Sequence, residues 1–458
     1  MKIKKTDREI LALALPAIFS NITVPLLGFS DTYISGHLGS DRYVAAIAVG
    51  SMMMNSCFWL FGFLRAGTTG LTAEALGRED SEAGRKIFTL AFSIAAAIGI
   101  ALILLSYPLR ILMLWLMDPP AATAILAGNY FMLCIFGAPA LLTTMTITGW
   151  MIGMQNTLYP MIVSISVNVL NIVISFSLVF LFNTGFYGVA VGTLSANWAG
   201  LLIALRLAHR LARHSVKDSA SEEQSGRIWC SLRNISNGID IGRFFRVNSD
   251  LMLRSACILC VTFGMTAFGG RMGDLTLAVN AIIMQLFLFY SYFSDGFAFS
   301  AEALCGRLAG ARDRHKFQEV IRRLWGWIGG VSVLFALIYF LGVGKIAEFL
   351  ADSPAIEEGA IRLKYVIGLV PLISGIAFLY DGIYIGLTAT RSMLVITLAG
   401  SLFFLSSYYL CRALGYTSPE VLNRALWTGF LGFLAIRAFG LVGALPHELK
   451  RLKLINDR

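Results

Sequence analysis

The segment TAEALG at residues 72–77 returns as SAEALCG at residues 300–306. A second pair of segments, GWMIG at 149–153 and GIYIG at 382–386, follows in the same order. Both pairs lie about 230 residues apart, which is half the length of the 458-residue chain. The sequence therefore predicts two homologous halves in tandem. Because both halves are strongly apolar, this arrangement is typical of secondary transporters.

The composition indicates a membrane protein. Hydrophobic residues make up 57% of the chain, charged residues only 14%, and the mean hydropathy is +0.72. Soluble proteins carry about 25% charged residues. The sequence predicts an all-α membrane protein whose twelve transmembrane helices are each long enough to cross the hydrocarbon. The predicted spans are 9–36, 42–68, 86–107, 123–150, 157–182, 187–211, 243–269, 275–302, 320–343, 359–387, 392–412 and 420–444.

The basic residues predict the orientation. They cluster at both ends of the chain, in the second and eighth loops, and in the segment between the halves. These segments, including both termini, are expected to be cytoplasmic. The protein itself is expected to cross the inner (plasma) membrane many times. Six spans per half give the halves the same orientation, so a pseudo-two-fold axis along the membrane normal relates them. The predicted domains are an N-lobe at 1–212 (helices 1–6, with the cation site), a cytoplasmic linker at 213–240 and a C-lobe at 241–458 (helices 7–12).

Other classes of function are not expected. The net charge of +10 is distributed over short loops and forms no basic face on a soluble domain, so nucleic acid is not an expected partner. The chain has no GxSxG, HExxH or P-loop motif, and its histidines show no metal-ligand spacing. We therefore expect no enzyme, no metal site and no cofactor. Uphill transport would then depend on H⁺ or Na⁺ as the coupling ion.

Asp31 is the first candidate for that coupling. It lies inside the first span, six residues after Pro25, which frees a backbone carbonyl and lets the helix bend near the acid. A charged side chain at the centre of a span costs roughly 2.5–3.5 kcal/mol, so it usually has a partner or a function. Removal from water favours the protonated carboxyl, as proton coupling requires, whereas Na⁺ would bind the ionised form. Alternatively, Asp31 is solvated or caps the helix near the outer interface.

Polar residues of the fifth and sixth spans are the candidate partners of Asp31. Asn171 and Ser175 are four residues apart and share one helix face. Together with Asn168 and Thr193, they are predicted to hydrogen-bond the acid or to ligate a cation. The alternative is that these residues only hold neighbouring spans together.

The second half carries its own set of polar residues. Asp250 and Arg254 are spaced as an i,i+4 ion pair. Acids among aromatic residues suit a lipophilic cation. For Glu302, the alternative is a structural role that it shares with Glu74 of the repeated AEAL segment. The predicted substrate site or polar network of the C-lobe comprises Asp295, Asp381, Arg254, Asp250, Tyr384 and Glu302.

Several stretches together resemble the multidrug and toxin compound extrusion (MATE) family, in the branch named after DNA-damage-inducible protein F (DinF). The stretches run in the family's order over nearly the whole chain. They are FSDTYISG at 29–36, NVLNIVIS at 168–175, GVAVGTLSA at 188–196, NSDLMLRSA at 248–256, YSYFSDGFAFSAEALCGRLAGARD at 290–313 and FLYDGIYIG at 378–386.

The resemblance implies two six-helix lobes with a V-shaped central cavity, and export of lipophilic, often cationic compounds in exchange for H⁺ or Na⁺. The protein is expected to be a monomer. It implies a cation site built on Asp31, with Asn171, Ser175 and Thr193 as partners, and it gives Asp381 an acidic counterpart in related members. In the family pattern, position 175 usually carries Asp. With Ser175 the site has one carboxylate instead of two, so H⁺ coupling is expected rather than Na⁺.

Two other functions stay open from the sequence. One is a flippase for lipid-linked or polysaccharide precursors, which usually has extra spans and a more cationic cavity. The other is a polytopic sensor, which would need a soluble signalling domain and would not explain Asp31 or the repeat.

Overall fold

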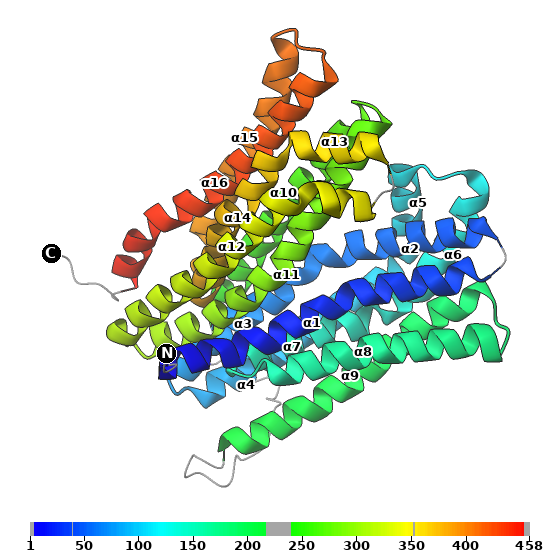
Figure 1. Ribbon diagram of the computed structural model, residues 1–458. Helices are drawn as coiled ribbons and strands as arrows, with labels where there is room; N and C mark the ends of the chain where they lie inside the picture. The colour runs from blue at the N-terminus through cyan, green and yellow to red at the C-terminus, as the bar shows by residue number, and fades with distance from the viewer. Residues whose placement is uncertain (1–3, 39, 217–239, 351–352, 453–458) are drawn as a thin grey trace. The chain divides into compact units, whose positions relative to one another are not determined.

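A computed structural model describes residues 4–38, 40–216, 240–350 and 353–452. All regular elements in these residues are helices (Figure 1). The first half contains α1 (Lys5–Gly36), α2 (Asp41–Trp59), η1 (Leu60–Gly62), α3 (Phe63–Gly77), α4 (Ser81–Leu104), α5 (Ser106–Met117), α6 (Ala121–Cys134), η2 (Ile135–Gly137), α7 (Ala138–Gly153), α8 (Leu158–Phe176), η3 (Ser177–Leu181) and α9 (Phe186–Val216). The second half contains α10 (Ile241–Gly270), α11 (Asp274–Gly310), α12 (Arg314–Leu350), α13 (Pro354–Arg362), α14 (Lys364–Gly386), α15 (Thr390–Ala413) and α16 (Pro419–Arg451).

The twelve predicted spans are confirmed. Among the described residues, 12 helical segments are long and apolar enough to cross a membrane. Several extend further than predicted: α11 continues to Gly310 rather than to 302, and α16 to Arg451 rather than to 444. The added residues of α11 include the buried Ala303, Leu304 and Cys305, so the helix continues within the packed protein beyond the predicted end of the span.

Two short helices were not predicted. α5 has 12 residues, which is too few to cross the hydrocarbon. α13 has 9 residues and begins with Pro354, a residue suited to the first turn because its missing N–H would have no partner there. Both helices occupy segments that were read as loops or as the edges of spans.

The chain forms two compact units, which are described separately. One unit comprises Phe19–Phe244, and its central helix α7 packs on α3, α4 and α9. The other unit comprises Met1–Ile18 and Phe245–Arg458, and its central helix α14 packs on α11, α12 and α16. In each half, the fourth span thus contacts the second, third and sixth. The internal repeat seen in the sequence is therefore also a repeat of helix packing.

The repeated glycines explain why these segments resemble each other. A Cβ atom added to Gly149 of α7 would overlap the backbone carbonyl oxygen of Arg65 in α3. A Cβ atom added to Gly382 of α14 would overlap the backbone carbonyl oxygen of Ala298 in α11. In both units, then, the backbones of two helices touch at a glycine. Small residues at such crossings are the usual way to bring membrane helices together.

The starts of α1 and α10 pack within different units from the rest of their helices. In the unit that holds most of the second half, the carbonyl of Ile10 in α1 accepts a 3.0 Å hydrogen bond from Ser300 of α11. In the other unit, Phe244 of α10 joins the apolar cluster of Leu71 and Ile87. The predicted linker at 213–240 lies largely outside the described residues, since 217–239 are not described. The predicted lobes at 1–212 and 241–458 stay a prediction.

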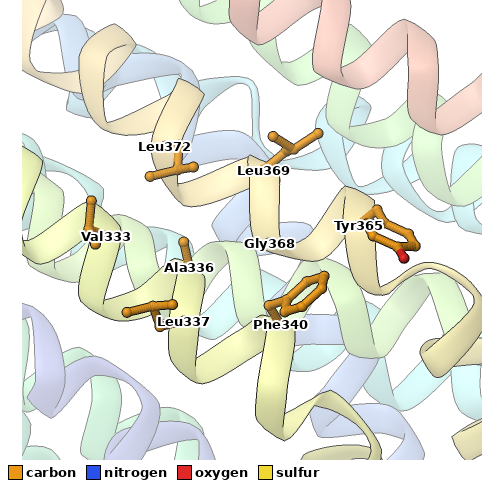
Figure 2. Close-up of a pocket in the computed structure, with 8 residues that line it drawn as sticks. All are labelled: Val333, Ala336, Leu337, Phe340, Tyr365, Gly368, Leu369 and Leu372. Carbon is orange, nitrogen blue, oxygen red and sulfur yellow. The ribbon is translucent and has the colours of Figure 1, made fainter.

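α12 and α14 leave a groove between them. Figure 2 shows its side chains: one row comes from α12 and the other from α14. All lining residues are apolar apart from the hydroxyl of Tyr365, and the groove encloses about 350 Å³.

We predict that Gly149→Ala and Gly382→Ala each destabilise the protein. The added methyl group would meet a backbone oxygen at less than 3.0 Å, so the helices must move apart. Overpacking of this kind costs about 1–3 kcal/mol. The matched control is Gly330→Ala in α12, because a Cβ atom there meets nothing within 4 Å. The measurement is the thermal melting temperature in detergent, and equal melting of all three variants would contradict the prediction.

Candidate functional site

Asp31 lies in α1, within the unit formed by Phe19–Phe244. Its side chain is only partly exposed, and Oδ1 is buried without a hydrogen-bond partner. Within the described residues Asp31 forms no ion pair. Its charge acts on the Tyr130 hydroxyl and the Cys134 thiol of α6, both of which are buried. The acid therefore lies in a poorly solvated place beside groups that carry no positive charge.

The predicted partners in α8 and α9 form a short hydrogen-bonded chain. Asn171 donates to the Thr193 hydroxyl at 3.1 Å, and Ser175 donates to the Asn171 carbonyl oxygen at 3.2 Å. Asn171 and Ser175 are buried, and Thr193 donates in turn to the backbone carbonyl of Val189 at 3.1 Å. The structure thus brings together three of the four partners that the sequence predicted.

Tyr130 connects these hydrogen-bonded residues to Asp31. Its hydroxyl interacts with Thr193 as well as with Ser51 of α2, while Asp31 acts on it electrostatically. The ring packs against Gly50, where an added Cβ atom would lie 2.6 Å from the ring carbon Cδ1. Tyr130 was not among the predicted site residues, because a single tyrosine in an apolar span gives no signal of its partners.

Asn168 has a different place. Its side-chain amide donates to the Thr23 hydroxyl at 2.8 Å. Thr23 lies about two helical turns before Asp31 on α1. Asn168 thus ties α8 to α1 but makes no hydrogen bond to the acid.

The other unit contains a buried ion-pair cluster. Asp381 of α14 accepts hydrogen bonds through Oδ2 from both Arg254 of α10 and Arg437 of α16. Asp381 is 6% and Arg437 3% exposed. The guanidinium of Arg437 also lies 5.0 Å from the centre of the Phe433 ring, a cation–π distance. Arg437 was not among the predicted site residues, although burying an arginine in the middle of the twelfth span costs as much as burying the predicted acids.

The expected ion pair between Asp250 and Arg254 is wrong. Arg254 binds Asp381, as the preceding cluster shows, because it reaches across to α14. Asp250 instead accepts a 3.0 Å hydrogen bond from Thr390 and pairs with Arg391 at 3.7 Å. Spacing along one helix predicted a local pair, but contacts between helices decided the partners.

The remaining predicted residues either act electrostatically on this cluster or hydrogen-bond a backbone carbonyl. Asp295 and Glu302 of α11 both act electrostatically on Arg254. The Tyr384 hydroxyl donates to the carbonyl of Leu441 at 2.8 Å, and its ring is fully buried. Tyr384 therefore joins α14 to α16 and does not face a ligand with its hydroxyl.

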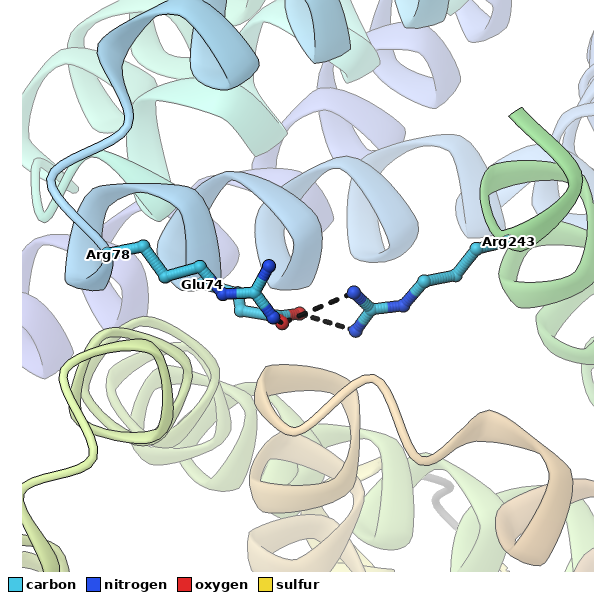
Figure 3. Close-up of polar contacts among 3 residues, drawn as sticks. All are labelled: Glu74, Arg78 and Arg243. Atoms are coloured by element: carbon cyan, nitrogen blue, oxygen red, sulfur yellow. Dashed lines mark hydrogen bonds and ion pairs between the residues drawn. The ribbon is translucent and has the colours of Figure 1, made fainter. Parts of the chain in front are cut away.

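Glu74 forms an ion-pair group of its own (Figure 3). It accepts from Arg78, one turn later on α3, and from both terminal nitrogens of Arg243 at 3.2 and 2.5 Å. Figure 3 shows the two guanidinium groups approaching one carboxylate. A bidentate arginine–carboxylate contact fixes orientation as well as distance, so it holds the start of α10 on α3.

Comparison with known proteins decides the family. The MatE family model matches residues 16–177 and 251–410. The chain belongs to the MatE family of transporters. DNA damage-inducible protein F of Escherichia coli K12 is 32% identical to it, over 96% of this chain and 92% of that protein. Members of the MatE family are transporters rather than enzymes, and they need no cofactor.

More distant MatE proteins also match this chain over most of their length. The probable multidrug resistance protein NorM of Thermotoga maritima is 24% identical over 86% of this chain and 83% of its own. A crystal structure of the Vibrio cholerae MATE transporter VcmN in the bent form superposes with a TM-score of 0.79, covers 98% of both chains and is 18% identical. At that identity the structural match shows the fold alone.

We predict that Asp381→Asn strongly destabilises this MatE protein. Its loss leaves two guanidiniums in a buried place without their carboxylate, and breaking a buried ion pair in this way costs about 3–5 kcal/mol. Asp250→Asn is the matched control, because that acid is equally buried but its basic partner is 71% exposed. Detergent melting curves should show a much larger loss for Asp381→Asn. Equal losses would mean that the cluster does not stabilise the unit.

Proposed function

We propose that this chain is a secondary active exporter of lipophilic, cationic compounds, driven by H⁺ influx through Asp31 with alternating access. The observation that carries the proposal is the carboxyl group of Asp31, which has a buried oxygen without a hydrogen-bond partner and no basic partner among the described residues. A carboxyl group in such a place binds a proton readily, because ionisation would leave an uncompensated charge away from water. The protonated carboxyl group therefore suits this buried place, whereas the ionised carboxylate favours a place with water or a positive charge.

Asp381 of the other unit differs from Asp31, because it does have basic partners. Asp381 is bound by two guanidiniums, so its carboxylate already has two basic partners within the protein. The arrangement supports a coupling role for Asp31 and a structural role for Asp381.

The hydrogen bonds near Asp31 favour H⁺ over Na⁺. A sodium ion needs several oxygens turned toward one point, in addition to the acid. Here the Asn171 oxygen accepts from Ser175, and the Thr193 hydroxyl accepts from Asn171 and donates to the backbone. These oxygens are thus engaged with one another. A proton needs only the carboxyl group itself.

The substrate class is supported by the relatives and by charge. Proteins similar to this chain are named as multidrug resistance proteins, in Thermotoga maritima and in Edwardsiella ictaluri. A flippase for anionic lipid-linked precursors would need available positive charge, but Arg254 and Arg437 both bind Asp381. We further propose that the protein works as a monomer in the plasma membrane with both termini in the cytoplasm.

We predict that Asp31→Asn abolishes proton-driven export without loss of folding. Asn cannot release a proton, and it adds no charge to the buried position. Wild type and variant are reconstituted in liposomes, and efflux of a fluorescent lipophilic cation is followed under an imposed pH gradient, and separately under a Na⁺ gradient at constant pH. Transport is expected with the pH gradient in wild type only.

Asp274→Asn is the control for this experiment, because Asp274 is an exposed acid in the first turn of α11. This variant should transport like wild type. Transport that follows the Na⁺ gradient would overturn H⁺ coupling, and undiminished transport by Asp31→Asn would remove Asp31 from the mechanism.

A further inference from the structure

The groove between α12 and α14 is open on one side and apolar throughout. Leu337 is 54%, Leu369 45% and Tyr365 65% exposed along its walls. Two small residues, Ala336 and Gly368, leave room between these walls. A Cβ atom on Gly368 would already lie 3.3 Å from the Phe340 side chain. Both helices are long and apolar enough to cross a membrane, and acyl chains suit such an apolar surface better than water does.

A lysine lies at one end of the groove. Lys364 is the first residue of α14, and its ammonium lies 5.6 Å from the centre of the Phe340 ring and 5.2 Å from the centre of the Tyr365 ring. These are cation–π distances. At the end of a span, a lysine directs its charge to the headgroup region, where tyrosine is also common. The groove therefore runs from the headgroup level into the hydrocarbon.

Lys364 differs from its neighbour Arg362 in its ionic contacts. Within the part of the chain that the structure describes, Lys364 forms no ion pair. Arg362, two residues earlier, contrasts with it: Glu358 and Glu420 bind its guanidinium at 2.9 and 3.1 Å. The hydrogen bond and charge of Glu358, with those of Glu420, raise the pKa of Arg362. Of these two neighbouring cations, only Lys364 is available to an external anion.

We propose that this groove binds one anionic phospholipid of the surrounding bilayer, with an acyl chain along α12 and α14 and the phosphate on Lys364. The volume of about 350 Å³ is in the range of about 300–1,000 Å³ that ligand pockets occupy. A lipophilic cation fits less well, because the ammonium already covers both aromatic rings and would repel a second positive charge. The proposal does not depend on the coupling ion or on the exported compound.

The test is native mass spectrometry of the purified full chain, released from detergent with phosphatidylglycerol or phosphatidylcholine of identical acyl chains. Wild type is expected to retain phosphatidylglycerol preferentially. Lys364→Gln should lower that retention about fivefold, which corresponds to roughly 1 kcal/mol for one lysine at an anionic surface. Lys345→Gln is the matched control, because Lys345 is an exposed lysine of α12 outside the groove.

A second pair of variants tests the apolar part. Ala336→Leu narrows the groove and should lower retention of both lipids, whereas Gly330→Leu adds the same side chain to α12 at an open position outside the groove and should not. Unchanged retention in Lys364→Gln and Ala336→Leu would overturn the proposal. So would retention of tetraphenylphosphonium instead of phosphatidylglycerol by wild type, if Ala336→Leu abolishes that retention, because the occupant would then be a lipophilic cation.

Discussion

Close contact between helix backbones is the constraint on which both units depend. At Gly149 and Gly382 there is no room for a side chain between one helix and the carbonyl oxygens of the next. Gly153 and Gly386, one turn later, repeat the contact against Thr72 and against the backbone of Glu302. Lipid gives apolar helices no reason to prefer one another over acyl chains, so tight van der Waals packing of this kind determines which helices associate. In each half, the repeated glycine segment and the repeated AEAL segment thus lie on the two sides of one helix contact.

The same helix packing holds two buried acids in different surroundings. In one unit, the central helix α14 carries Asp381 to the place where Arg254 and Arg437 reach it. In the other unit, α1 carries Asp31 to a buried place with the neutral neighbours Tyr130 and Cys134. Both acids face the cost of leaving water. Asp381 offsets it with two arginine partners, whereas Asp31 has no basic partner among the described residues. Two units with the same helix packing thus differ in their buried acids: one acid is held by two arginines, and the other has no such partner among the described residues.

Much of the architecture was predictable from the sequence, and the reason is the membrane. Hydrocarbon requires long apolar helices, so composition and length are enough to give twelve spans, and the repeat gives their pairing between halves. The buried acids were also predictable, because each is an exception in an apolar segment. Their partners were not: Asp250 and Arg254 are spaced for a pair on one helix, yet each bonds to a different helix. Tyr130 and Arg437 take part through contacts distant in sequence, which one chain without its fold does not reveal.

The packing also bears on why position 175 carries serine. A Cβ atom on Gly192 would overlap the Ser175 hydroxyl oxygen and lie 2.9 Å from the Ser175 Cα atom, so α8 and α9 touch at this point. Ser175 is fully buried there, with its hydroxyl directed to Asn171. A carboxyl group at position 175 would need space and solvation that this contact does not supply. A small side chain at position 175 is therefore what the close spacing of α8 and α9 requires.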